Sequence, residues 1–130
     1  MGVSRAIAVL PSTTLNLGAT GNSATYTNRD CRGLLVAVKN TAGGGTSPTL
    51  TVKLQEYFDG AGWVDVAGAT TAAIVGTTPG TTTFVVYPGV TAAANAYVNR
   101  PLAKSWRLAW TIGGSATPTV TCSVDAVMLP

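Results

Sequence analysis

The sequence predicts an all-β protein, an antiparallel β-sandwich of jelly-roll or immunoglobulin-like topology. Apolar and polar residues alternate with a period of two in several separate segments, which is typical of strands with one buried face. Glycine (15 residues) and proline (7 residues) are frequent and threonine is abundant, as expected for short strands joined by turns. Seven or more such segments can form two packed sheets, which we favour over a closed barrel.

The length and composition describe one domain with apolar surface to cover. A chain of 130 residues can bury one core but not two. We expect residues 31–130 to form the sandwich and residues 1–30 to form edge strands or an extended N-terminal arm. The chain is 46% hydrophobic with a mean hydropathy of +0.32. No apolar run reaches the roughly 20 residues of a membrane helix, so we expect a protein partner and no membrane.

The clearest element is a β-hairpin over residues 49–67. Leu50, Val52, Leu54 and Phe58 share one face of its first strand and predict a buried side. The sequence Asp59-Gly60-Ala61-Gly62 then supplies turn-forming residues, and an extended pattern resumes at Trp63–Val66.

The segments before the hairpin are less regular. We expect a strand over 5–10 that ends at Pro11, and short strands or an arm over 12–17 and 23–27. The nearly continuous apolar run in 33–40 predicts a central strand covered on both faces. The glycine-rich stretch 41–48 predicts a flexible loop.

The segments after the hairpin end in two strongly alternating strands. Residues 71–75 predict a strand or a helical turn, 81–87 a strand, and 90–98 a short helical turn. Strands over 104–112 and 119–128 should be joined by a turn at 113–116. Trp106 and Trp110 share the apolar face of their strand, and Cys122 shares that of the next, so we expect all three in the core.

The sequence favours a protein that is not an enzyme. It contains no histidine, which excludes Ser-His-Asp and Cys-His catalytic groups. Among the carboxylates, Glu56 and Asp65 could face each other across the hairpin, but a solvated Asp65 is the favoured interpretation. Glu56 lies on the apolar side, so it should reach solvent or pair with a cation such as Arg107 or Lys53. We expect no cofactor and no metal ion.

Other residues indicate binding surfaces. Tyr57 and Trp63 lie opposite in parity to their apolar neighbours, so they should be exposed and adjacent, where they can contact glycan or protein. The net charge is +3, but the eight basic residues are scattered, which argues against specific nucleic-acid binding. Cys31 and Cys122 could form a disulfide only if their strands are neighbours, and free thiols are the favoured alternative.

Several phrases of the sequence together resemble a known class of proteins. They are residues 34–43, 48–55 and 59–66, followed by Trp106–Gly114 and Thr117–Thr121. Their layout is similar to that of small β-sandwich structural proteins of tailed bacteriophages: head decoration, minor capsid and tail accessory proteins. The resemblance covers about residues 32–130.

The resemblance implies a non-enzymatic virion protein, assembled in the host bacterial cytoplasm, where thiols stay reduced. We expect a capsid decoration or cement protein that binds the major capsid protein and stabilises the head. A tail or neck accessory protein is one alternative, and a carbohydrate-binding or adhesin module that uses Tyr57 and Trp63 is another. We expect a homo-oligomer, with a trimer favoured, whose contacts involve residues 1–25. Arg29, Arg32 and Arg100 are the candidates for contact with an acidic shell surface.

Overall fold

The computed structural model describes residues 4–17 and 21–130, and within them the chain is mainly β-strand with no α-helix. Residues 1–3 and 18–20 of the expected N-terminal arm lie outside the described residues. The predicted all-β class is confirmed. The strands are β1 (Arg5–Asn16), β2 (Gly21–Asn22), β3 (Tyr26–Thr27), β4 (Gly33–Phe58), β5 (Gly62–Thr70), β6 (Ile74–Val75), β7 (Gly80–Val86), β8 (Tyr97–Val98) and β9 (Ser105–Leu129).

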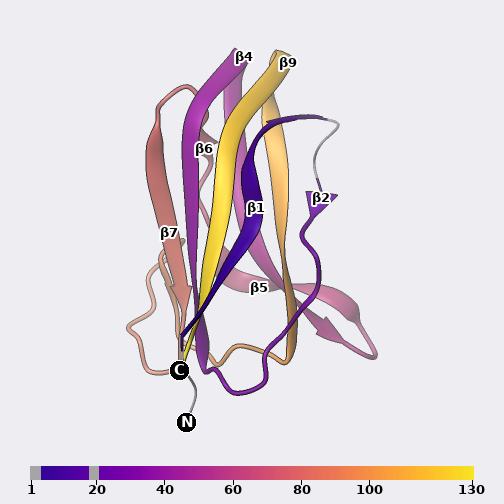
Figure 1. Ribbon diagram of the computed structural model, residues 1–130, viewed down its shortest axis with the longest axis vertical. Helices are drawn as coiled ribbons and strands as arrows, with labels where there is room; N and C mark the ends of the chain where they lie inside the picture. The colour runs from indigo at the N-terminus through magenta and orange to yellow at the C-terminus, as the bar shows by residue number, and fades with distance from the viewer. Residues whose placement is uncertain (1–3, 18–20) are drawn as a thin grey trace.

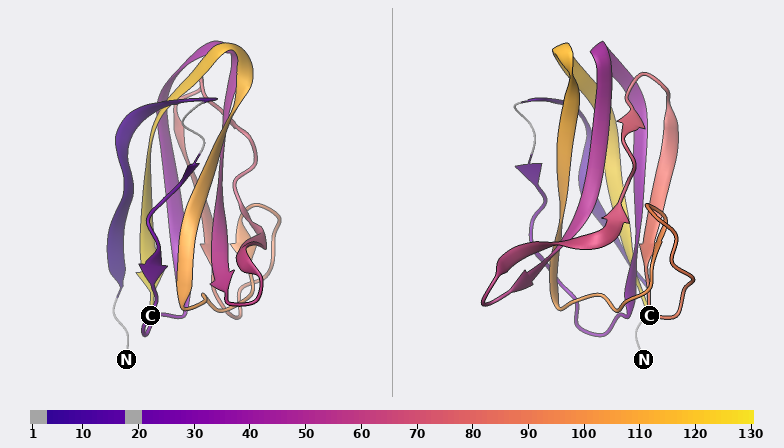
Figure 2. Two further views of the ribbon diagram at one scale, coloured as in Figure 1. Left: turned by 90° about the vertical axis from the view of Figure 1, so that its right-hand side faces the viewer. Right: turned by 180° about the vertical axis from the view of Figure 1, so that it is seen from behind.

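Two long strands, β4 and β9, organise the fold. They pair antiparallel from Gly33 opposite Leu129 to Glu56 opposite Trp106, and both bend over at the same end of the molecule (Figure 1). Register shifts between Asn40 and Thr49 mark the bend in β4. Each strand therefore crosses from one layer of the sandwich into the other, as both views of Figure 2 show.

The bend corrects two expectations. The stretch 41–48 is part of β4 rather than a flexible loop, and residues 113–116 are part of β9 rather than a turn between paired strands. Gly45 (φ 81°) and Gly114 (φ 116°) lie in the left-handed region, which glycine adopts without steric cost. These glycines are unpaired positions at which the register shifts, and the pairing of β4 with β9 resumes on both sides of them.

The hydrogen-bonded sheet folds over into two layers. The first layer has the order β1–β9–β4–β7–β8, with the pairs between residues 33–44 and 119–129 at its centre. In the second layer, β2 and β3 flank β9 while β5 and β6 flank β4. Every strand pair is antiparallel except β7 with β8. Residues 90–98, expected as a helical turn, instead form a turn closed by a bridge from Ala93 to Tyr97.

The core lies between the layers and contains the side chains that the alternation predicts. Trp106 is fully buried and Trp110 is 8% exposed, as expected. Phe58, predicted for the core, is 46% exposed because the hairpin extends beyond the opposite layer. The largest fully buried apolar side chains are Trp106, Phe84, Leu34, Leu50, Leu54 and Leu108.

The N-terminal segment lies on its own chain. Strand β1 pairs antiparallel with β9 at one edge of the first layer and places Leu15 in the core. We expected Pro11 to end this strand, but the strand continues through it. Pro11 lies between the paired residues Leu10 and Thr13, where the register shifts. Proline is tolerated at such a bulge on an edge strand because no ladder hydrogen bond is required of it.

The two cysteines are buried at different levels of the sandwich. Cys122 is 1% exposed, as predicted, and pairs with Asn40, while Cys31 precedes Gly33, which pairs with Leu129. The seven residues of strand between these levels separate the sulfur atoms by roughly 20 Å. That spacing is far beyond the reach of an intrachain disulfide.

Candidate partner-binding end of the sandwich

The predicted hairpin is present and projects from one end of the molecule. Glu56, Tyr57 and Phe58 pair with Val64, Trp63 and Gly62, and the backbone N–H of Ala61 donates to the carbonyl of Phe58 across the turn. Figures 1 and 2 show the tip extending past the body of the sandwich. The tip is therefore available to another molecule on both of its faces.

The outer face of the hairpin carries an aromatic cluster. The rings of Tyr57 and Trp63 lie 5.4 Å apart in a tilted edge contact, and Tyr57 is 43% exposed. The guanidinium of Arg107 on β9 lies over the Trp63 ring, 4.3 Å from its centroid. The expected adjacency of the two aromatic residues is confirmed, but Trp63 is half-buried rather than exposed because Arg107 lies over its ring. Because Arg107 covers one face of the indole, a sugar ring could stack only on the opposite face.

A chain of hydrogen bonds fixes this cluster across three strands. Arg107 Nε donates to Gln55 Oε1 (2.8 Å), and Gln55 Nε2 donates to Asp65 Oδ1 (2.8 Å). Lys53 Nζ donates to Asp65 Oδ2 (2.9 Å). The hydrogen bond from Lys53, then that from Gln55, lowers the pKa of Asp65. The network holds Arg107 over the indole ring and leaves Tyr57 at the edge of the cluster.

The opposite face of the hairpin is apolar at the tip and charged at the base. Phe58 (46% exposed) and Val64 (39% exposed) lie beyond the sandwich. Glu56, which pairs directly with Val64 and lies two pairs further in than Phe58, is fully buried. Three of the six large hydrophobic side chains most exposed among residues 4–17 and 21–130 therefore belong to this tip: Tyr57, Phe58 and Val64.

Glu56 anchors the base of the hairpin. Arg100 Nη2 donates to its Oε1 (2.5 Å), and the backbone N–H of Ala103 donates to its Oε2 (2.8 Å). A cation was expected here, but the partner is Arg100 rather than Arg107 or Lys53. Two donors compensate the buried carboxylate, so the connection between β8 and β9 is held against the hairpin.

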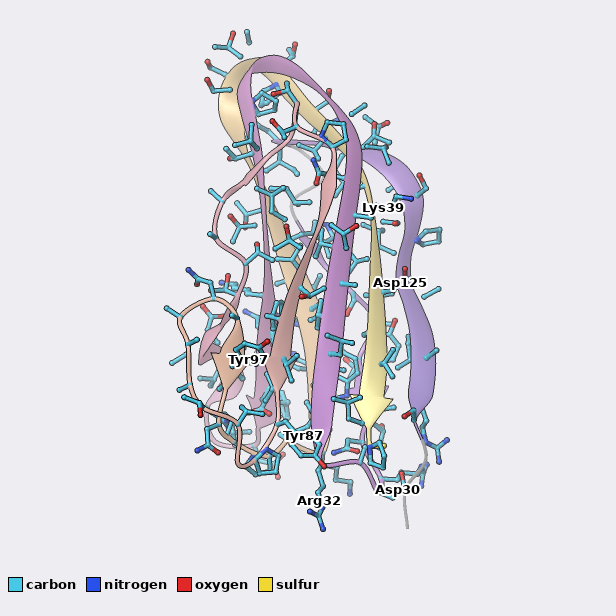
Figure 3. The ribbon with its side chains drawn as sticks, turned by 90° about the vertical axis from the view of Figure 1, so that its left-hand side faces the viewer. Asp30, Arg32, Lys39, Tyr87, Tyr97 and Asp125 are labelled. Atoms are coloured by element: carbon cyan, nitrogen blue, oxygen red, sulfur yellow. The ribbon has the colours of Figure 1, made fainter. Side chains whose placement is uncertain are left out.

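The predicted contact arginines lie at this same end. Arg29 and Arg32 are exposed in the connection from β3 to β4, and Figure 3 shows Arg32 pointing away from the sandwich. The backbone N–H of Leu102 donates to the carbonyl of Arg32 (2.9 Å), which joins this connection to the segment that carries Arg100. Arg100 is the exception among the three, because its guanidinium is already paired with Glu56.

We call this region the basic end: the connections 28–32 and 99–104 together with the hairpin tip 57–64. Lys104, which the sequence analysis did not single out, is exposed there beside the arginines. Within the described part of the chain, Arg29, Arg32 and Lys104 form no ion pair. The same region also contains Asp30, which pairs with Arg5, and the exposed Asp59 at the hairpin tip. The basic end thus combines an excess of cationic over anionic side chains with exposed aromatic surface.

The carboxylates do not form a catalytic pair. Asp65 pairs with Gln55 and points outward, whereas Glu56 points into the sandwich, so the two lie on opposite faces of the hairpin. No group of three potential metal ligands occurs in residues 4–17 and 21–130. Over the same residues, no helix is long and apolar enough to cross a membrane.

Comparisons with known proteins establish the fold class. No family model and no curated protein matches the chain. A chain in the structure of infectious bursal disease virus, Gt strain, aligns over 98% of this chain with a TM-score of 0.50 and 15% identity. Its counterpart in the Gx strain aligns over 97% with a TM-score of 0.50 and 14% identity. Our chain spans 33% of the length of each viral chain.

A CBM4 structure aligns over 82% of this chain and 56% of its own length, with 11% identity. Its TM-score of 0.42 does not establish a common fold. The protein is therefore a β-sandwich whose fold is similar to that of a viral chain.

Proposed function

We propose that this protein is a non-enzymatic structural component of a virion, and specifically a capsid decoration protein of a tailed bacteriophage. In this proposal it binds the assembled head from outside and stabilises it. The observation that carries the proposal is the basic end, where the exposed Tyr57 and Phe58 lie at the same end as Arg29, Arg32 and Lys104, three cations that form no ion pair within the described residues. Aromatic residues and arginine are enriched where proteins bind proteins, and clustered positive charge attracts an acidic shell.

The basic end divides the binding between two kinds of contact. The hairpin tip offers Tyr57, Phe58 and Val64 as apolar contacts that lose water on docking. Arg29 and Arg32 steer the approach and contact acidic side chains of the major capsid protein. Arg100 contributes indirectly, because its ion pair with Glu56 holds the hairpin in position.

Electron microscopy of particles from host cells that express this gene tests the proposal. Density for the protein is expected on the head, with the hairpin directed at the shell. Density on the tail or neck would instead support a tail accessory protein, and absence from both would contradict a virion role.

Binding to purified particles at increasing salt then tests the surface. The double variant Arg29→Glu, Arg32→Glu should lose at least about tenfold in affinity, and wild-type binding should weaken as salt screens the charges. Thr111→Glu, on the side of the sandwich, is the matched control and should bind normally. Equal losses in both proteins would contradict the assignment of the basic end.

The adjacent rings of Tyr57, which is exposed, and Trp63, which is half-buried, also favour a second candidate, a carbohydrate-binding or adhesin module. In that case Trp63→Ala should abolish retention on a glycan while the protein remains folded. The stacked Arg107 counts against this candidate, since it covers one face of the indole. A glycan array without binding would remove it.

A further inference from the structure

The outer face of the first layer is an open sheet surface. Along β4, Leu34, Val36 and Val38 are fully buried, whereas the alternate residues Leu35, Ala37 and Lys39 point away from the core. Figure 3 looks onto this side, with β7, β4, β9 and β1 side by side. No other element of the described chain covers it.

Strand register aligns apolar residues in one row across this face. Val85 on β7 pairs with Leu35 on β4, and Leu35 pairs with Val127 on β9. The row continues at both ends, to Tyr97 on β8, which is 47% exposed, and to Ala6 on β1. Five strands spaced about 4.8 Å apart give a row roughly 20 Å long.

Two charged residues lie on the same face, in the two rows that follow the apolar row. Asp125 pairs with Ala37 in the next row, and Lys39 pairs with Ser123 in the row after it. Both are exposed, and neither forms an ion pair within residues 4–17 and 21–130. Figure 3 places them on adjacent strands near the middle of the face. Their flanks on β7 are uncharged threonines, Thr83 and Thr81.

We propose that this face binds the same face of a second copy of the chain. A two-fold axis along the strands, between β4 and β9, puts each β4 over β9 of the other copy. The apolar rows then meet each other across the roughly 10 Å that separates packed sheets. Lys39 of each copy then lies roughly 7 Å along the strand direction and roughly 10 Å across the interface from Asp125 of the other copy, a gap that the two side chains can span when both extend toward each other.

Opposite charges side by side on one surface make it complementary to itself, which is what a two-fold contact requires. A face that binds itself closes at two copies, so this inference replaces the trimer expected from the sequence. It does not depend on the virion role. Residues 5–16, expected to contact a neighbour as an arm, contribute here as edge strand β1, through Ala6.

The size of the face sets the expected affinity. A sheet roughly 20 Å wide and six residues deep offers on the order of 400 Å² of projected area. A standard interface buries about 800 Å² on each partner, so this contact falls at the weak end of the range. We expect a dissociation constant on the order of 10–100 μM, with dimers dominant only at high protein concentration.

A charge-swap experiment tests the inference on the full chain. Molar mass is measured by sedimentation equilibrium over concentrations spanning the expected dissociation constant. Lys39→Asp and Asp125→Lys each place like charges together twice per dimer, so each should weaken association about tenfold or more. The double variant restores opposite charges and should recover the wild-type dimer. Thr111→Asp, on the outer face of the second layer, is the control and should not change association.

An apolar variant tests the row independently of the charges. Leu35→Lys should abolish the dimer while circular dichroism and the melting temperature stay close to those of the wild type. If Leu35→Lys does not fold, Val85→Lys replaces it. A monomer at every concentration, a mass of three chains, or a double variant as weak as the single ones would overturn the proposal. So would an equal effect of Thr111→Asp.

Discussion

The ion pair between Glu56 and Arg100 provides the sharpest test of how the hairpin is held. Arg100→Gln removes the cation and leaves a fully buried carboxylate whose remaining donor is the backbone N–H of Ala103. Glu56→Gln removes the charge instead, retains an acceptor for Ala103, and leaves Arg100, whose side chain is 40% exposed, free to turn toward water. The two substitutions break the same contact but have unequal consequences.

The loss of folding free energy in each variant depends on whether the buried carboxylate or the partly exposed guanidinium remains without its partner. A buried charge without its partner costs about 3–5 kcal/mol, and the remaining backbone hydrogen bond places Arg100→Gln at the lower end of that range. Loss of one charge-assisted hydrogen bond in Glu56→Gln costs about 1–2 kcal/mol. The double variant should be more stable than Arg100→Gln alone, because no unpaired charge remains buried.

Urea unfolding of the four proteins measures these free energies. Lys53→Gln is the matched control, because its ion pair with Asp65 is largely exposed and should be worth about 0.5 kcal/mol. If Arg100→Gln costs no more than Glu56→Gln, or if the double variant is the least stable protein, the carboxylate does not depend on Arg100. The anchoring of the hairpin would then have another cause.

Three further outcomes are expected. Gly43→Ala should destabilise the fold by about 1–3 kcal/mol, because a Cβ there would lie 2.6 Å from the backbone of Gly76. Gly60→Ala is the control, because a Cβ there meets open space and should change stability by less than about 0.5 kcal/mol. Urea unfolding compares the two variants. The pKa of Asp65 is lower in the folded than in the unfolded chain, so its small stabilising contribution is present above about pH 4 and is lost as pH falls through the folded pKa. Asp65→Asn should therefore reduce the dependence of the free energy of unfolding on pH, and only in that acid range. Burial raises the pKa of the Cys122 thiol, so alkylation should require denaturant, and mass spectrometry of the unreduced chain should show no loss of mass from an intrachain disulfide.

Local patterns predicted what local interactions determine. The hairpin over residues 49–67 was predictable because alternation and turn chemistry lie within one short stretch. The same alternation placed Trp106, Trp110 and Cys122 in the core. The alternation also predicted a buried Phe58, which is wrong, because the alternation continues past the point where the opposite layer ends.

The bend in the long strands was not predictable, because it depends on pairing between distant segments. Residues 41–48 and 113–116 have the glycine content of loops, and only the ladder between β4 and β9 makes them strand. The candidate site shows the same division. The parity of Glu56 identified it as exceptional, but its partner Arg100 lies 44 residues away in a connection without periodicity.

The path of β4 and β9 through both layers has a consequence for how the chain folds. Their paired residues are 50 to 96 positions apart, from Glu56 with Trp106 to Gly33 with Leu129. Loops of that length make the decisive pairings slow to form, because closure entropy must be overcome before any contact compensates it. During synthesis, β4 leaves the ribosome long before β9 is made, so its apolar residues remain exposed to solvent until β9 can pair with it. We therefore expect nascent chains ending before Ser105 to be captured by chaperones, and neither layer to fold alone.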